Sequence, residues 1–310
     1  MLPDRPSRLV RGLVAMAALA LLAAGCSSNV SPSPSSSTVG AASYSVFPVV
    51  VSPDLATGEN RLLFVFVDKD NKPVSAPDRS ASVAVSSGDA PSASAAPVAA
   101  AFEWGNEAAK QGYYVADVTF PKAGSWSAVF TTSASNAPKE QIPYQFDVKD
   151  KHTAVSVGQP APKTATPTAA SVDGRLAEVS TDQSPDADFY GLSEDQALDQ
   201  HKPFVIVFAT PAFCTSALCG PTLDRVKAIS KDYPSVTFIH VEPYQMQVVD
   251  GKLQPILDAN GQLQSNKVTD AWGLPAEPWV FVVDRKGIVQ ASLDIVFGDD
   301  ELKAAIDKVK

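Results

Sequence analysis

Alternating apolar and polar positions fill the chain between residues 44 and 149. The alternation has the two-residue period of strands that cover one face of a core. It predicts strands at residues 44–51, 61–67, 82–85, 112–120, 125–130 and 142–148. Turn residues separate these strands, and the Ala/Ser/Pro-rich segment 88–101 is expected to be a flexible loop. Short strands with frequent turns predict an all-β antiparallel sandwich over residues 44–149.

From about residue 188 the pattern changes to apolar runs that alternate with helical segments. Residues 204–208 are an uninterrupted apolar run, as expected for a central strand covered on both faces. Further strands are predicted at residues 236–241, 279–283 and 288–293, the last two as a hairpin. Ser193 and Gln196 form a capping box that begins a helix ending near residue 200. Helices are also predicted at residues 217–231 and 299–309, the second acidic at its start and basic at its end.

Two segments of low complexity separate these regions from each other and from the N-terminus. Residues 26–43 are rich in Ser and Pro and predict a flexible tether. Residues 150–187 are rich in Pro, Ala and Thr, and predict either an extended linker or an arm along the following domain. The chain is therefore expected to be multidomain, with a β-sandwich at 44–149 and an α/β domain at 188–310.

The first 25 residues have the pattern of a secretion signal. Arg5, Arg8 and Arg11 precede an apolar run at residues 13–24, which is shorter than the ~20 residues of a spanning helix. The segment ending in Gly25–Cys26 resembles a bacterial lipobox, although Ala23 stands where that motif usually has Leu. The resemblance implies lipidation of Cys26 and attachment to the extracytoplasmic face of the cell membrane. The alternatives are an ordinary signal peptide and a single spanning anchor.

The charge of the chain excludes one class of partner. Its formal net charge of -9 argues against nucleic-acid binding, which favours a basic surface. The sequence also lacks a glycine-rich phosphate loop and a dinucleotide-binding fingerprint, so no cofactor is predicted.

Three cysteines are present, and two of them form a close pair. Four residues separate Cys214 from Cys219, while Cys26 belongs to the leader motif. In an oxidising compartment such a pair predicts a structural disulfide or a redox couple.

The C-terminal region resembles the thioredoxin fold from about residue 192 to Lys310. The resemblance rests on the segment 205–214, a strand and loop ending in Cys214, and on the segment 277–284, which contains Pro278. In that family the first cysteine follows a strand at a helix N-terminus, and a cis proline packs against the pair. The resemblance implies that Cys214 attacks, Cys219 resolves the mixed disulfide and Pro278 shapes the substrate groove; Pro275 is the alternative proline.

The chain departs from the thioredoxin pattern in several places. The family spacing is two residues, and the family's buried acid would fall at Val207. Phe213 stands where the family has Trp. Residues five apart on a regular helix point about 140° away from each other, so Cys214 is expected in the loop, with the helix starting near Ser216.

The first domain resembles the small immunoglobulin-like domains of bacterial envelope proteins. This resemblance rests on Gly112, Tyr114 and the Phe120-to-Trp126 segment, and these residues are expected to be turn and core residues. No chemistry is assigned to them.

Two other functions of the thioredoxin scaffold are disfavoured. Copper-delivery proteins carry a His near the cis proline, whereas residues 276–279 contain none, and His240 with Glu242 is a weak metal motif better explained by the core. Peroxiredoxins have Thr and Pro where this chain has Pro211 and Val207. Gln245 to Gln247 lie in a predicted insertion, residues 244–267, which is expected to be a solvent-facing loop; the alternative is that these three residues line a groove for a partner.

These observations lead to two functional hypotheses. The first is a membrane-anchored thiol–disulfide oxidoreductase that acts through Cys214 and Cys219 on the thiols or disulfides of exported proteins or on a membrane electron donor. The second is a non-catalytic envelope binding module with a structural disulfide. Copper delivery is a third and weaker hypothesis, and no metal site is predicted.

Overall fold

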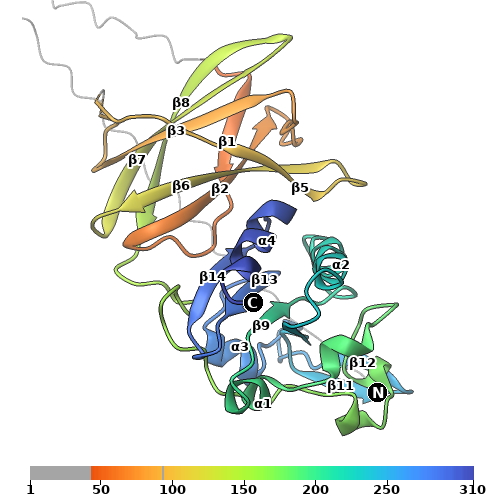
Figure 1. Cartoon of the computed structure of the whole chain (residues 1–310). Helices are drawn as coiled ribbons and strands as arrows, with labels where there is room; N and C mark the ends of the chain where they lie inside the picture. Colours follow the sequence, from red (N-terminus) through yellow and green to blue (C-terminus); the bar gives the residue numbers. More distant parts are fainter. Residues whose placement is uncertain (1–42, 93) are drawn as a thin grey trace, which may run out of the picture. The chain divides into compact units, whose positions relative to one another are not determined.

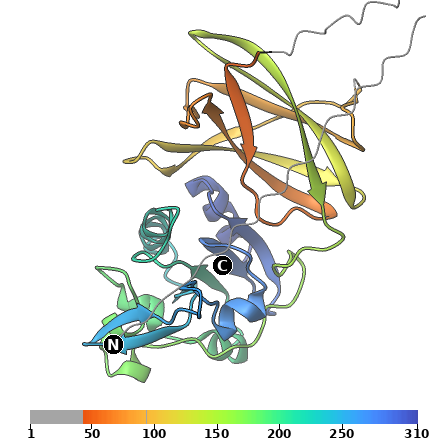
Figure 2. The same ribbon diagram turned by 180° about the vertical axis from the view of Figure 1, so that it is seen from behind.

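Eight strands form two stacked antiparallel sheets in the first half of the chain (Figure 1 and Figure 2). In the computed structural model, which describes residues 43–92 and 94–310, the first sheet has the order β1–β2–β6–β5 and the second β4–β3–β7–β8. The strands are β1 (Val46–Val50), β2 (Gly58–Asp68), β3 (Ser80–Ser87), β4 (Val98–Ala99), β5 (Ala101–Asn106), β6 (Gln111–Phe120), β7 (Gly124–Ala134) and β8 (Ala137–Val148). The predicted β-sandwich is confirmed.

The core of the sandwich is aromatic. Its largest buried side chains include Phe64, Phe66, Tyr114 and Phe130, which come from both sheets. Phe66 packs edge to face with Phe64 and Tyr114, while Phe64 stacks on Tyr114. Trp126 is also buried, and its indole N–H donates to the Lys122 carbonyl, so it serves the core and the turn.

One part of the sandwich was not expected from the sequence. Segment 88–101, predicted as a flexible loop, contains the short strand β4, and β5 follows directly and pairs with β6. Strand β4 has only two residues among alanines and serines, which carry little hydrophobic signal, whereas β5 does alternate at Phe102 and Trp104 and was overlooked.

The second half of the described chain contains a mixed sheet with helices on both faces. The sheet has the order β10–β9–β13–β14, where β9 (Phe204–Phe208) is parallel to β10 (Thr237–Val241) and antiparallel to β13 (Trp279–Val283). The edge strand is β14 (Val289–Asp294). Every residue of β9 and β13 is buried, which explains the continuous apolar runs.

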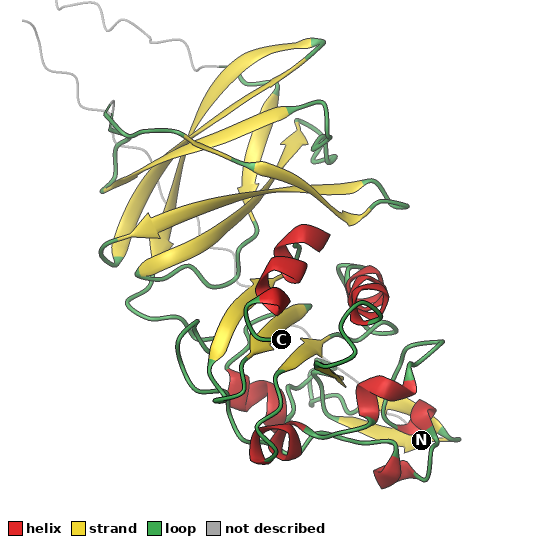
Figure 3. Ribbon diagram, viewed as in Figure 1, coloured by secondary structure: helices red, strands yellow, loops and turns green. Residues whose placement is uncertain are grey.

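The four α-helices of the described residues, 43–92 and 94–310, all lie in this second half (Figure 3). They are α1 (Glu194–Asp199), α2 (Cys219–Ser230), α3 (Lys267–Trp272) and α4 (Asp299–Asp307). Helices α2 and α4 cover one face of the sheet, and α1 and α3 cover the other (Figure 1).

The helix predictions were partly correct. The capping box of Ser193 and Gln196 is present at the start of α1. Helix α4 has an acidic first turn but no basic residue in its last turn, so the basic end predicted for it is wrong. Helix α3 was not predicted. The predicted insertion contains a hairpin of β11 (Met246–Val249) and β12 (Lys252–Pro255) instead of an unstructured loop.

Residues 150–187 lie against the second half of the chain. Val155 N–H donates to the Trp272 carbonyl (3.0 Å), and Gly158 N–H donates to that of Val289 (2.8 Å). Short 3-10 helices occur at Ala170–Val172, Leu176–Glu178 and Ala187–Tyr190. Of the two predicted roles for this segment, the arm is the one observed.

Residues 43–310 form one compact unit, in which a buried arginine joins the sandwich to the second half. Arg61 of β2 contacts Asp294 (2.5 Å) and Glu301 (2.7 Å) and donates to the Val296 carbonyl (2.6 Å). Leu63, Leu218 and Val296 form a small apolar cluster beside it.

The leader and Cys26 lie outside the described residues. Within residues 43–92 and 94–310, no helix has the length and apolar character needed to cross a membrane.

Candidate functional site

The cysteine loop begins where β9 ends. The N–H groups of Phe213 and Cys214 both donate to the Thr210 carbonyl, at 3.1 and 3.0 Å, and form a tight turn. Cys214 therefore lies in the loop that follows the C-terminal end of the central strand β9, and it is partly exposed. Cys219 is the first residue of α2 and is fully buried. The helix begins two residues later than the predicted position 217.

Ala217 gives the loop its shape. Its φ of 57° is in the left-handed region, which is uncommon for a residue with a Cβ. The reversal at Ala217 brings the Cys219 N–H to the Cys214 sulfur, with an N···S distance of 3.4 Å. The Ser216 hydroxyl lies 3.2 Å from the same sulfur. The spacing of four residues is thus compatible with close approach, because the backbone folds back on itself.

These contacts favour a thiolate at Cys214. A hydrogen bond from the Cys219 thiol lowers the pKa of the Cys214 thiol to about 5, against the opposing effect of burial, and the Ser216 hydroxyl and the loop amides lower it further. The same hydrogen bond, burial and the negative charge of Cys214 raise the pKa of Cys219. The more exposed sulfur therefore favours the thiolate form that a nucleophile needs, and the buried one favours the protonated form. Both cysteines are free thiols in the structure.

Glu277 is a third member of the cluster. Its carboxylate and the two sulfurs lie within 4.8 Å of one another. Burial raises the pKa of Glu277; the hydrogen bond with Tyr244 opposes this, and the charge of Cys214 adds to it. Sequence reasoning missed this residue, and the one available signal was an acid directly before Pro278.

The cluster has the ligand types of a metal site. Among the residues that the structure describes, Cys214, Cys219 and Glu277 are the group of His, Cys, Asp and Glu side chains that converges in this way. Two thiolates and a carboxylate are ligands that zinc accepts. The sequence predicted no metal.

Pro278 is buried at the start of β13, and the Glu277–Pro278 peptide bond is cis. Its carbonyl accepts from the Ile295 N–H at 2.9 Å. Val207, where the thioredoxin family has an acid, lies in the apolar core with Cys219. The acid of this site therefore comes from the segment before β13 instead of from β9.

His240 and Glu242 belong to the core. The His240 ring nitrogens contact the Tyr190 hydroxyl (2.5 Å) and the Ala209 carbonyl (2.9 Å), and burial lowers the pKa of His240. Glu242 accepts from the Thr181 N–H (2.6 Å). With both ring nitrogens engaged, the weak metal motif in the sequence is explained by packing.

A cavity of about 390 Å³ lies at the cysteine loop. Ser216, Tyr244 and Glu277 line it from the second half of the chain. Val51 and Tyr113 line it from the sandwich. The cavity is therefore built by residues far apart in the sequence, and periodicity could not have predicted it.

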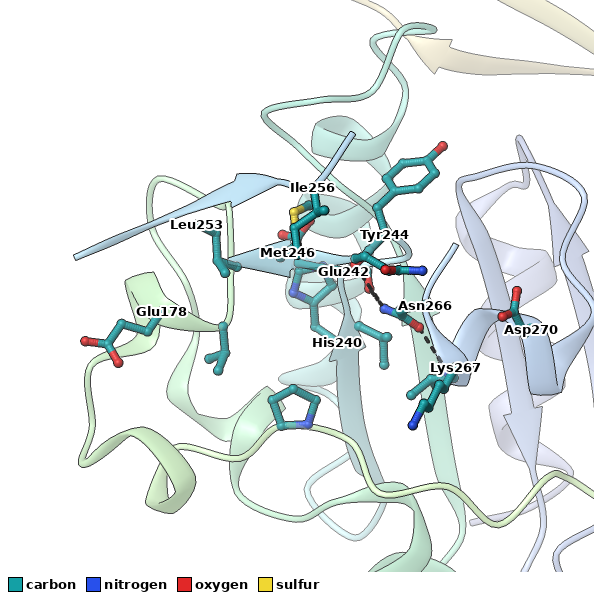
Figure 4. Close-up of a pocket in the computed structure, with 15 residues that line it drawn as sticks. Glu178, His240, Glu242, Tyr244, Met246, Leu253, Ile256, Asn266, Lys267 and Asp270 are labelled. Atoms are coloured by element: carbon teal, nitrogen blue, oxygen red, sulfur yellow. Dashed lines mark hydrogen bonds between the residues drawn. The ribbon is translucent and has the colours of Figure 1, made fainter. Parts of the chain in front are cut away.

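A larger cavity of about 510 Å³ lies between the β11–β12 hairpin, the arm and the start of α3 (Figure 4). Gln245 and Met246 line it, whereas the sequence predicted a solvent-facing loop there. Asn266 closes one side by donating to the carbonyls of Glu242 (2.5 Å) and Tyr244 (3.3 Å). No residue of the cysteine loop lines it, whereas Ser216, Leu218 and Glu277 line the smaller cavity, so the candidate chemistry lies beside the smaller cavity.

Comparison with known proteins gives no family for this chain. No family model matches it, and no curated protein matches it. A solved structure of a DUF4426 family protein from Pseudomonas aeruginosa PAO1 aligns with 34% of this chain and 90% of its own, at 12% identity and a TM-score of 0.24. A score this low carries no information about the function.

Proposed function

We propose that this chain is a membrane-anchored, extracytoplasmic thiol–disulfide oxidoreductase. In this proposal residues 188–310 are a thioredoxin-like domain, residues 44–149 are an immunoglobulin-like domain, and Cys26 carries the lipid anchor. The observation that carries the proposal is the Cys214 sulfur, which follows a central strand and accepts the Cys219 N–H at the start of α2. A thiol in such a position reacts as a thiolate at neutral pH.

The reaction is a thiol–disulfide exchange, in which the substrate disulfide is broken and the Cys214–Cys219 disulfide is formed. The Cys214 thiolate attacks one sulfur of a substrate disulfide, so that a mixed disulfide forms and the other substrate sulfur leaves as a thiolate. The Cys219 thiolate then attacks the Cys214 sulfur, which forms the Cys214–Cys219 disulfide and releases the second substrate thiol. The substrate is reduced by two electrons and the pair is oxidised by two. Run backwards, the same steps oxidise a dithiol.

The second step requires deprotonation of Cys219. Glu277 is the acid within reach of the Cys219 sulfur, since their ligand atoms lie within 4.8 Å. We assign it as the group that accepts the Cys219 proton, in place of the acid that β9 lacks. Tyr244, which hydrogen-bonds the Glu277 carboxyl, positions it.

Turnover needs a partner that restores the pair. For net reduction, a dithiol of a membrane electron donor would transfer two electrons to the Cys214–Cys219 disulfide. Exported proteins with cysteines would be the substrates. Attachment through Cys26 would hold the site at the membrane surface, near such partners.

The reduction potential of the pair is the direct test. The full chain, purified in detergent, is equilibrated across glutathione buffers, and the fraction of alkylated Cys214 and Cys219 is measured. A potential near or above about -270 mV supports exchange, whereas structural disulfides usually lie below about -300 mV. A pair that stays oxidised throughout, or never closes, would contradict the proposal and favour the binding module with a structural disulfide.

Trapping identifies the direction of attack. Cys219→Ser should accumulate mixed disulfides with envelope proteins through Cys214, because the resolving thiol is absent. The matched variant Cys214→Ser should accumulate far fewer, since Cys219 is buried. Equal trapping by the two variants would refute the assigned roles.

A further inference from the structure

The sandwich supplies one wall of the cavity beside the cysteine loop. Val51 and Tyr113 line this cavity together with Ser216 and Glu277, which flank the reactive sulfur. Burial raises the pKa of Tyr113, and the charge of Cys214 adds to the effect, which is consistent with a tyrosine ring close to the thiolate. Part of the cavity beside Cys214 is therefore formed by the sandwich, whereas Cys214 itself belongs to the second half of the chain.

The hairpin of β5 and β6 is joined to the cysteine loop itself. The Asn106 side chain donates to the carbonyl of Ala217, the left-handed residue of that loop, at 3.2 Å. One residue earlier, a Cβ on Gly105 would lie 2.7 Å from the Tyr113 ring and 2.8 Å from the Leu218 side chain. The backbone of β5 thus fits closely between a cavity-lining residue and the cysteine loop.

A second contact fixes the same hairpin to α2. Arg225 donates to the carbonyls of Trp104 (3.0 Å) and Phe297 (2.6 Å), and it pairs with Asp299 (3.0 Å). The Tyr113 ring is therefore held between two contacts, one to the cysteine loop and one to the helix that follows it.

The composition of the cavity defines the substrate class. Val51, Tyr113 and Ile295 contribute apolar and aromatic surface to the cavity, and Glu277 is the acidic residue among those that line it. The chain as a whole carries a net charge of -9. An anionic small disulfide such as oxidised glutathione is poorly matched to this surface, whereas an uncharged apolar side chain next to a cystine is well matched.

We propose that Tyr113 and Val51 are specificity-determining residues of the exchange site, and that they select polypeptide disulfides with an apolar side chain next to the reacting cysteine. This inference rests on the proposed oxidoreductase function. It assigns to the sandwich a role in substrate selection.

Two synthetic substrates test it. Each is the disulfide of a capped pentapeptide, one with phenylalanine beside the cysteine and one with serine there. The fully reduced full chain, in detergent, is mixed with each disulfide under single-turnover conditions, and the second-order rate constants are measured. The wild-type chain should prefer the phenylalanine peptide by about tenfold, the effect of one well-packed aromatic contact.

The variants separate substrate selection from stability. Tyr113→Ala and Val51→Ser should each reduce the preference to less than about threefold, because the rate with the phenylalanine peptide falls more than the rate with the serine peptide. The reduction potential of each variant is measured beside these rates to show whether the cysteine pair itself has changed. Tyr113→Phe should keep the preference, because the ring remains. Phe47→Ala removes an exposed aromatic side chain of the sandwich that does not line the cavity, and this control variant should keep the preference.

Each outcome decides one point. A wild-type chain with equal rates, or a preference that survives in both Tyr113→Ala and Val51→Ser, overturns the specificity assignment and leaves the exchange function intact. A wild-type chain that reduces neither peptide overturns the exchange function and this inference with it. Should Tyr113→Ala fail to fold, Val51→Ser still tests the specificity assignment, because Val51 follows β1 whereas Tyr113 belongs to β6.

Discussion

At the scale of single residues, the pKa of Cys214 depends on the hydrogen-bond donors that surround its sulfur. The strongest effect on its pKa is the hydrogen bond from Cys219, and the Ser216 hydroxyl and the loop amides add to it. The groups of Leu218 and Cys219 follow the backbone reversal at Ala217, which turns them back toward Cys214. The cysteines could be predicted from their spacing, but the conformation that activates one of them could not.

The pH dependence of alkylation should report this activation. With a pKa of about 5, Cys214 should react with iodoacetamide at a rate that rises through pH 5 and is level between about pH 7 and 8. Cys219→Ala should shift the midpoint upward, because the main hydrogen bond is lost. The rate is measured by mass spectrometry of the Cys214 peptide. A wild-type midpoint near the ordinary thiol value of about 8.5 would contradict the assignment.

Glu194 should make the stability of the fold depend on pH. It is the first residue of α1 and is fully buried, and its carboxyl accepts from the Trp272 indole (3.1 Å) and the Thr164 hydroxyl. Burial raises the pKa of Glu194 from 4.5 to about 8, so the folded state holds a proton that the unfolded state releases between these values. The free energy of unfolding should therefore fall as pH rises from about 4.5 to 8, by up to about 1.4 kcal/mol per unit.

Urea unfolding at pH 5 and pH 8 measures this effect. Glu194→Gln keeps a neutral side chain of the same shape and should lose most of the fall. Glu107→Gln, at an exposed position, should behave as the wild-type chain does. A Glu194→Gln variant with the wild-type slope would show that another group is responsible.

At the scale of elements, the apolar runs were the reliable signal. Strands β9 and β13 were predicted because each is buried on both faces, and α1 because its capping box is local in sequence. Strand β4 was missed because it is only two residues long among small residues that carry no clear period, while the short alternation of Phe102 and Trp104 in β5 was overlooked. Glu277 was missed as a site residue because its approach to the sulfurs depends on tertiary packing, which no local pattern reveals.

Gly273 at the end of α3 is the point where the arm approaches the helix most closely. It has a φ of 67°, and a Cβ there would lie 2.0 Å from the Thr153 carbonyl oxygen. Gly273→Ala should destabilise the fold by about 3 kcal/mol, from backbone strain and the displaced arm. Gly261→Ala meets the same backbone strain, with a φ of 75° and open space around the Cβ, and should cost about 1 kcal/mol. Equal losses in urea unfolding would show that the arm contributes nothing at this point.

At the scale of the whole molecule, Arg61 is the main ionic link between the sandwich and the second half. It is 13% exposed and pairs with Asp294, itself 10% exposed. Arg61→Met should destabilise the fold by about 3–5 kcal/mol, because it leaves the Asp294 carboxylate buried without its partner. Thermal unfolding followed by circular dichroism measures the loss.

Two variants control this experiment. Arg61→Met combined with Asp294→Asn removes the orphaned charge and should recover part of the stability. Arg175→Met removes an exposed arginine that also has two acidic partners, and it should change the stability little. A double variant no more stable than Arg61→Met would mean that lost packing, and not the unpaired carboxylate, causes the destabilisation.

The contacts of Asn106, Arg61 and Arg225 hold the Tyr113 wall against the cysteine loop before any substrate arrives. The entropic cost of assembling this site is therefore met during folding and not at each encounter. Capture of a peptide then needs no closing movement of one half of the chain on the other. Its kinetics should be those of a single bimolecular step, with an observed rate that rises linearly with peptide concentration and reaches no plateau before the chemical exchange itself becomes limiting.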